Sequence, residues 1–142
     1  MTKVLQRFGM ESTKPVGSTL PTNYKLSGSQ CPKSKTKKAE MSKVPYASIV
    51  GSLMYAMVCT RPDITYGVGV VSRYMNNPRR EHWAVVKWIP RYLRGTLSVC
   101  LRFGSGNTML EGYTNSNMST DVYTNESTSG YIMMYAWGGI SW

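Results

Sequence analysis

The sequence predicts an α+β protein with three parts: a largely disordered basic N-terminal segment, a bundle of three helices, and a β-hairpin near the C-terminus. The first indication is an unusually apolar segment that ends abruptly at Thr60-Arg61-Pro62-Asp63. The second is helical spacing of apolar residues over residues 62–93. The third is the strand-like branched and aromatic content after residue 98.

Charge divides the 142 residues and their net charge of +10 into unlike parts. Residues 1–43 hold nine Lys or Arg and two acids, residues 44–103 eight and two, and residues 104–142 none and three, giving +7, +6 and −3. The turn residues Gly104-Ser105-Gly106-Asn107 predict a linker at this change. We therefore expect domains at 1–43, 44–103 and 108–142. A basic region suits nucleic-acid binding, and a solvated basic surface is the alternative.

The N-terminal 43 residues are rich in Lys, Ser, Thr and Pro, a composition typical of extended or disordered chain. A short helix is possible at Lys3–Phe8. The segment carries a cluster of lysines that either contacts phosphates, serves as an import signal or belongs to a solvated linker: Lys33, Lys35, Lys37 and Lys38.

The first helix of the bundle is predicted at Tyr46–Cys59, which carries only small and apolar residues apart from two serines. Pro62 ends it and suits the first turn of the next helix. The helix is too short to span a bilayer, which needs about 20 apolar residues. Ala47, Gly51 and Tyr55 fall at i, i+4 and i+8 and so share one face. That face either binds a ligand or packs against another helix that Gly51 lets approach.

Two further helices are predicted at Pro62–Met75 and Arg80–Leu93, with Gly95 in the usual C-terminal capping position. Pro90 lies inside the latter, where an interior proline costs about 3 kcal/mol. Gly67 and Gly69 weaken the former by about 1 kcal/mol each. Strands are expected by composition at Val99–Phe103, Met109–Thr114 and Thr128–Trp137, the last two paired as a hairpin.

Taken together, these segments resemble the Pol polyprotein of copia-type LTR retrotransposons. The resemblance covers essentially the whole chain in the family's order, through KVLQRFGMESTKPV, VPYASIVGSLMYAMVCTRPDI, YMNNPRREHW, VKWIPRYLRGT, LEGYTNSNMSTD, STSGY and ISW. It implies the end of the reverse transcriptase, with residues 44–103 as a thumb-like helical bundle, and the start of an RNase H-like domain at 108–142. Residues 1–43 would follow the polymerase core.

The resemblance also implies that this chain lacks catalytic groups. The family places a metal-binding Asp after the strand Gly112-Tyr113-Thr114, and this chain has Asn115 there. Two Mg²⁺ ions need charged ligands, which a carboxamide does not supply. Asp121 is not at a metal-binding position, and the palm carboxylates lie upstream in the family. We therefore expect a truncated, degenerate copy of the element that has no enzymatic activity and binds no cofactor. One alternative is a part of an active polymerase and RNase H whose catalytic residues other chains supply. The other is a pseudogene product without function.

The function expected is weak, sequence-independent binding of RNA–DNA or DNA duplex. The candidate binding residues are the helix face and nearby cations: Ala47, Gly51, Tyr55, Arg61, Arg73, Arg79 and Arg80. No metal site is expected, because the three cysteines lack ligand spacing and the lone His82 suits a structural role. Without a signal peptide or membrane segment, we expect an intracellular protein, cytoplasmic or nuclear. The sequence leaves the oligomeric state open.

Overall fold

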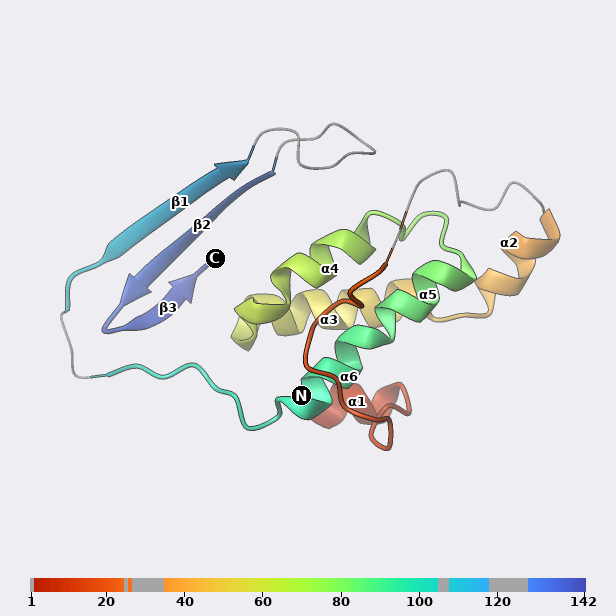
Figure 1. The fold of residues 1–142 in the computed structure, drawn as a ribbon, viewed down its shortest axis with the longest axis horizontal. Helices are drawn as coiled ribbons and strands as arrows, with labels where there is room; N and C mark the ends of the chain where they lie inside the picture. The colour runs from red at the N-terminus through yellow and green to blue at the C-terminus, as the bar shows by residue number, and fades with distance from the viewer. Residues whose placement is uncertain (1, 25, 27–34, 105–107, 118–127) are drawn as a thin grey trace. The chain divides into compact units, whose positions relative to one another are not determined.

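The computed structural model describes residues 2–24, 26, 35–104, 108–117 and 128–142, and for residues 35–38, 117 and 128 it describes the backbone alone. The chain is α+β and divides into two compact units, Met1–Val99 and Cys100–Trp142 (Figure 1). The first unit holds the described helices and the second the described strands.

Helix α3, Tyr46–Thr60, organises the first unit. Its buried residues recur at helical spacing and face the core: Tyr46, Ile49, Val50, Leu53 and Ala56. The helix ends where the backbone N–H of Arg61 bonds the carbonyl of Ala56 at 3.0 Å and Pro62 follows. The prediction of a helix that stops at this sequence is confirmed.

The second predicted helix is shorter than expected. Pro62–Ile64 form the 3₁₀ turn η2, and helix α4 covers Thr65–Ser72. Ile64, Val68 and Val71 are buried as their spacing predicts. Beyond Ser72 the chain continues in turns, with bonds from Tyr74 N–H to the carbonyl of Val71 and from Met75 N–H to that of Ser72.

The third predicted helix is two helices, α5 at Arg80–Val86 and α6 at Trp88–Gly95, joined at Lys87. The break explains how Pro90 is accommodated. A continuous helix would require the missing N–H of Pro90 to bond the carbonyl of Val86, but in the first turn of α6 that N–H needs no intrahelical partner. The expectation that Pro90 weakens a helix interior is therefore wrong.

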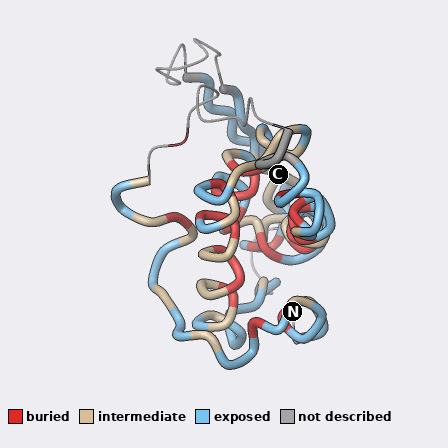
Figure 2. The backbone as a smooth tube through the Cα atoms, turned by 90° about the vertical axis from the view of Figure 1, so that its right-hand side faces the viewer, coloured by how far each residue is buried: buried red, intermediate tan, exposed pale blue. Residues whose placement is uncertain are grey.

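The N-terminal segment is not largely disordered over the residues described. Helix α1, Thr2–Arg7, is followed by a stretch that we call the strap, residues 10–24 and 26, within which Leu20 and Leu26 join the core cluster of the bundle. Figure 2 shows buried stretches in this segment as well as along the bundle helices. Helix α2, Lys35–Ser42, was not expected. Lys33 lies outside the described residues.

Two glycines let the strap approach the helices closely. A Cβ on Gly67 would stand 3.2 Å from the Cβ of Thr19, and one on Gly95 would stand 3.2 Å from the Cβ of Pro15. Gly95 is the last residue of α6 and Thr96 follows as its cap, so its role differs from the predicted one. Gly67 was expected only to weaken its helix, but the space that it leaves is where the strap packs.

The second unit is a three-stranded antiparallel sheet in the order β1-β2-β3, formed by Glu111–Asn117, Thr128–Tyr135 and Gly138–Ser141. The predicted hairpin is present as β1 and β2, with Asn115 opposite Gly130. A strand that was not expected follows a tight turn in which Ala136 and Trp137 have φ of 47° and 65°. The strand predicted at Val99–Phe103 is absent; Phe103 instead packs where Gly138 has no side chain.

Candidate nucleic-acid interface

The outer face of α3 is open along its length. Ala47, Gly51 and Tyr55 are all exposed, and Tyr55 retains 75% of its accessible surface. A Cβ added at Gly51 would meet no atom within 4 Å. Within the described part of the chain no helix packs at Gly51, so the close helix approach weighed as the alternative does not occur there. Arg7 of α1 reaches the edge of the face, where its Nη2 donates to the hydroxyl of Ser48 at 3.3 Å.

The open face is longer than the three predicted residues. Met54 and Val58 are 40% and 65% exposed and lie beside them at i+7 and i+11 from Ala47. We call these five residues the α3 stripe: Ala47, Gly51, Met54, Tyr55 and Val58. The stripe carries no charge, because α3 contains no Asp, Glu, Lys or Arg. Sequence reasoning stopped at Tyr55, although the same helical spacing pointed to Val58.

The hydroxyl of Tyr55 stays protonated at neutral pH. Its pKa is raised by a hydrogen bond with the Cys59 side chain one turn further along the helix, although the ring is largely exposed. The stripe thus offers an aromatic ring with a neutral polar tip.

A groove opens beside the first residue of the stripe. It has a volume of about 320 Å³ and lies between the end of α2, the start of α3 and the turn before α5. Its walls combine apolar side chains with amide groups: Met41, Ser42, Val44, Tyr46, Ala47, Met75, Asn76, Asn77 and Pro78.

Arg61 does not belong to a binding surface, which corrects the prediction. Its side chain is 3% exposed, and its Nε and Nη2 donate to the two carboxylate oxygens of Asp63 at 2.9 and 2.6 Å. Nη1 and Nη2 also donate to the carbonyl and hydroxyl oxygens of Thr96 at 3.2 and 2.6 Å. This guanidinium joins the end of α3 to the end of α6 and has no orientation left for a phosphate.

The Asp63 carboxylate is held by the same network. The hydroxyl of Tyr92 donates to its Oδ2 at 2.9 Å. The hydrogen bond from Arg61 is the main cause that lowers the pKa of Asp63 below its ordinary value, against the opposing effect of burial.

The other predicted cations lie near the α4–α5 connection. Arg73 and Arg80 are exposed. Arg79 is half-buried before α5, with its Nε 3.8 Å from Oε2 of Glu81. Its backbone N–H donates to Nδ1 of His82 at 3.1 Å. His82 is fully buried and stacks on Tyr74 with ring centres 4.1 Å apart, which agrees with the structural role expected of it.

Asn115 lies exposed on β1, and the described residues contain no group of three or more His, Cys, Asp or Glu that could hold a metal ion. Glu111 is on the same strand face four residues away, which corresponds to about 14 Å along a strand. Catalytic ions in two-metal sites stand only about 4 Å apart. The neutral carboxamide and the single distant carboxylate do not fit a pair of Mg²⁺ ions. Asp121 lies outside the described residues.

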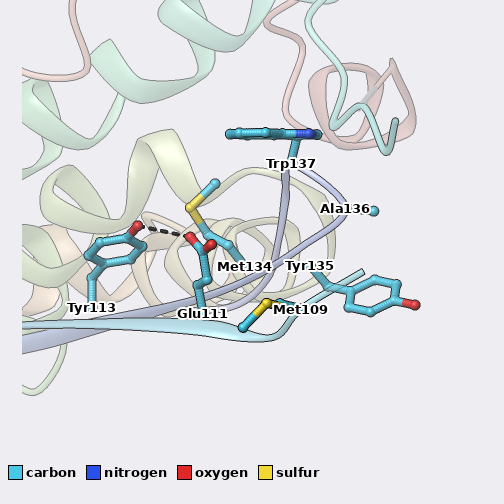
Figure 3. Close-up of a pocket in the computed structure, with 7 residues that line it drawn as sticks. All are labelled: Met109, Glu111, Tyr113, Met134, Tyr135, Ala136 and Trp137. Carbon is cyan, nitrogen blue, oxygen red and sulfur yellow. Dashed lines mark hydrogen bonds between the residues drawn. The ribbon is translucent and has the colours of Figure 1, made fainter. Parts of the chain in front are cut away.

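The pocket in the second unit is too small to be a ligand-binding site. It has a volume of about 70 Å³ and is lined by aromatic and apolar side chains around Glu111 (Figure 3). Glu111 is already engaged, because the hydroxyl of Tyr113 donates to its Oε2 at 3.0 Å. Pockets that bind small molecules are typically about 300–1,000 Å³, so this one is too small.

Comparisons with known proteins identify clear relatives. Over 140 residues the chain is 53% identical to the Retrovirus-related Pol polyprotein from transposon TNT 1-94 of Nicotiana tabacum, which covers 99% of this chain and 10% of the polyprotein. It is 36% identical over 143 residues to the Retrovirus-related Pol polyprotein from transposon RE2 of Arabidopsis thaliana, covering 98% and 9%. It is 42% identical over 103 residues to the Secreted RxLR effector protein 161 of Plasmopara viticola, covering 72% of each chain.

The chain therefore spans about a tenth of the polyproteins that it matches. No family model matches it, and no solved structure matches it. Among the described residues, no helix is long and apolar enough to cross a membrane.

Proposed function

Because the chain belongs to the copia-type Pol polyproteins of retrotransposons, we propose that it is a non-catalytic portion of such a polyprotein that holds nucleic acid. Its helical unit would serve as the thumb of the reverse transcriptase and its sheet as the first strands of RNase H. The observation that carries the proposal is the α3 stripe, an uncharged and open helix face on a strongly basic chain.

The stripe suits the sugar edge of a duplex groove rather than its phosphates. Gly51 leaves room for a backbone to approach, since no atom stands within 4 Å of the position of a Cβ. The ring of Tyr55 adds an apolar surface with a hydrogen-bonding tip. Nearby cations such as Arg73 and Arg80 would supply the phosphate attraction, which is independent of sequence and weakens with salt.

The Tyr55→Ala variant is expected to bind a labelled RNA–DNA hybrid roughly fivefold more weakly, about 1 kcal/mol, while its thermal unfolding midpoint stays within about 2 °C of the unmodified chain. The Tyr55 side chain is largely exposed, so its loss removes binding surface and little stability. Fluorescence anisotropy titrations at two salt concentrations measure this. Affinity should fall steeply at the higher salt.

Tyr66→Ala is the matched control, because Tyr66 is 70% exposed on α4, outside the stripe. Its hydroxyl bonds only that of Tyr24 among the contacts described for it. Equal losses for the two tyrosine variants would contradict a role for the α3 stripe, and absence of binding at low salt would contradict the proposal as a whole.

We further propose that the chain by itself cleaves and polymerises nothing. Asn115→Asp is expected to leave Mg²⁺-dependent cleavage of an RNA–DNA hybrid at the background of the assay, because one restored carboxylate does not assemble a two-metal site. A gel assay with a complete RNase H as positive control tests this. Robust cleavage by either the unmodified chain or the variant would contradict this proposal.

Two alternatives stay within the family. The first is a part of an active polymerase and RNase H whose catalytic carboxylates lie in the remaining nine tenths of the polyprotein. The second is an inherited sequence without a selected function. Sequencing the flanking genome separates them, since an intact upstream palm favours the former and stop codons the latter. An intracellular location, cytoplasmic or nuclear, is part of the proposal.

A further inference from the structure

The outer side of α6 carries cations that neither the core nor the α3 stripe uses. Lys87, Arg91 and Arg94 lie at i, i+4 and i+7 around the start and along the length of α6, and each is partly exposed. We call them the α6 cations. Lys14 of the strap is exposed close by, since the Nε of Arg91 donates to its carbonyl oxygen at 2.8 Å.

Among the described residues, these cations have no acidic partner. Helix α6 contains no Asp or Glu. In the part of the chain that the structure describes, ion pairs join Arg61 to Asp63 and Arg79 to Glu81, and neither involves an α6 cation. A basic row without counter-charges costs stability through self-repulsion, so an external anion would lower its free energy.

The α6 cations are also held in place before any ligand arrives. The Lys87 ammonium lies over the Trp83 ring at 5.8 Å, and the Arg91 guanidinium lies over the Trp88 ring at 4.5 Å. Nη1 of Arg94 donates to the carbonyl of Thr13 in the strap. Each contact uses one side of the cation and leaves other N–H groups for an anion. Fixing long side chains in advance reduces the entropy lost on binding.

We propose that the α6 cations, together with Lys14, form a second nucleic-acid contact that grips the phosphate backbone and is separate from the α3 stripe. The row from Lys87 to Arg94 spans about 10 Å at the rise of a helix. That length matches roughly three phosphates along one strand of a duplex, which are about 3.4 Å apart in projection on the axis. The proposal rests on the proposed function in taking the ligand to be nucleic acid, but it uses different residues.

The test compares the double variant Lys87→Gln/Arg91→Gln with the control Lys3→Gln/Lys43→Gln in the full chain. Both lose two positive charges, and Lys3 and Lys43 are exposed elsewhere on the same unit. Binding of a short labelled RNA–DNA hybrid is measured over a range of salt concentrations. The α6 variant is expected to bind about tenfold more weakly at low salt and to reduce the slope of log affinity against log salt by about two. The control should change both much less.

Two further measurements separate the loss of charge at Lys87 from a loss of folding. Lys87→Gln and Lys87→Arg are compared singly, because the arginine keeps the charge over Trp83 and should retain the affinity that glutamine loses. Circular dichroism should show the same unfolding midpoint for both.

The outcomes also distinguish this inference from the proposed function. Equal losses in the α6 and control variants would overturn the second contact while leaving the α3 stripe intact. A loss confined to the α6 variant, with Tyr55→Ala unaffected, would support the second contact alone.

If vesicles of phosphatidylcholine with phosphatidylserine bind the chain with the same dependence on Lys87 and Arg91, the surface serves anionic membranes and the nucleic-acid assignment is overturned.

Discussion

A chain shortened to residues 44–103 is expected to lose cooperative unfolding. The shortened chain lacks Leu20 and Leu26, which are 7% and 6% exposed within the core cluster. Removing one buried leucine side chain costs about 2–5 kcal/mol, and domains of this size are stable by about 5–15 kcal/mol in total. Losing both therefore removes a large share of the stability of the helical unit. Urea unfolding followed by circular dichroism measures this.

The control is a chain of residues 1–99, which keeps the first compact unit whole and should unfold in one sharp transition. In the full chain, Leu20→Ala should lower the unfolding free energy by about 2–4 kcal/mol, while Thr22→Ala, at an exposed position of the same strap, should change it by less than about 0.5 kcal/mol. A sharp transition for residues 44–103 at the same midpoint as for 1–99 would show that the strap is dispensable.

Arg61→Ala is expected to lower the unfolding free energy at pH 7 by about 3 kcal/mol. The substitution leaves the partly buried Asp63 carboxylate and the Thr96 carbonyl without their donor, and breaking a buried ion pair by removing one member typically costs about 3–5 kcal/mol. We take the low end because the Asp63 side chain is 31% exposed. Tyr92→Phe removes only one hydroxyl donor to Asp63 and should cost about 1 kcal/mol.

The cost of Arg61→Ala should also depend on pH. Arg61 lowers the pKa of Asp63 in the folded chain. The ion pair therefore stabilises the fold fully above the ordinary pKa of an aspartate, about 3.9, and this stabilisation is lost as the pH falls through the lower pKa that Asp63 has in the folded chain. The difference between the two chains should therefore shrink in strong acid. Burial lowers the pKa of His82 too, so protonation favours unfolding below about pH 6.5, but this occurs in both chains and cancels in the comparison. A difference that stays constant down to pH 2 would contradict the ion-pair explanation.

The sequence by itself determined those features that depend on neighbours in the chain. The apolar helix α3 and its stop at Pro62 follow from local sequence, so each was predicted. The family was determined in the same way, because ordered motifs along the whole chain are a property of the sequence. Composition predicted the two strands that form β1 and β2, and the family resemblance implied that they pair as a hairpin.

The tertiary structure decided which side chains are exposed and which are buried. Arg61, Arg73 and Arg80 have the same charge in the sequence, yet Arg61 is enclosed by Asp63, Tyr92 and Thr96 while the other two are exposed. Likewise, nothing near Leu20 in the sequence marks it as core, because most residues of the cluster that it joins lie on helices more than twenty residues away. From the sequence, Gly67 was predicted to weaken its helix and Gly95 to cap one, whereas in the structure both are positions where the strap packs closely. Burial depends on contacts between distant segments, and local composition and spacing do not specify those contacts.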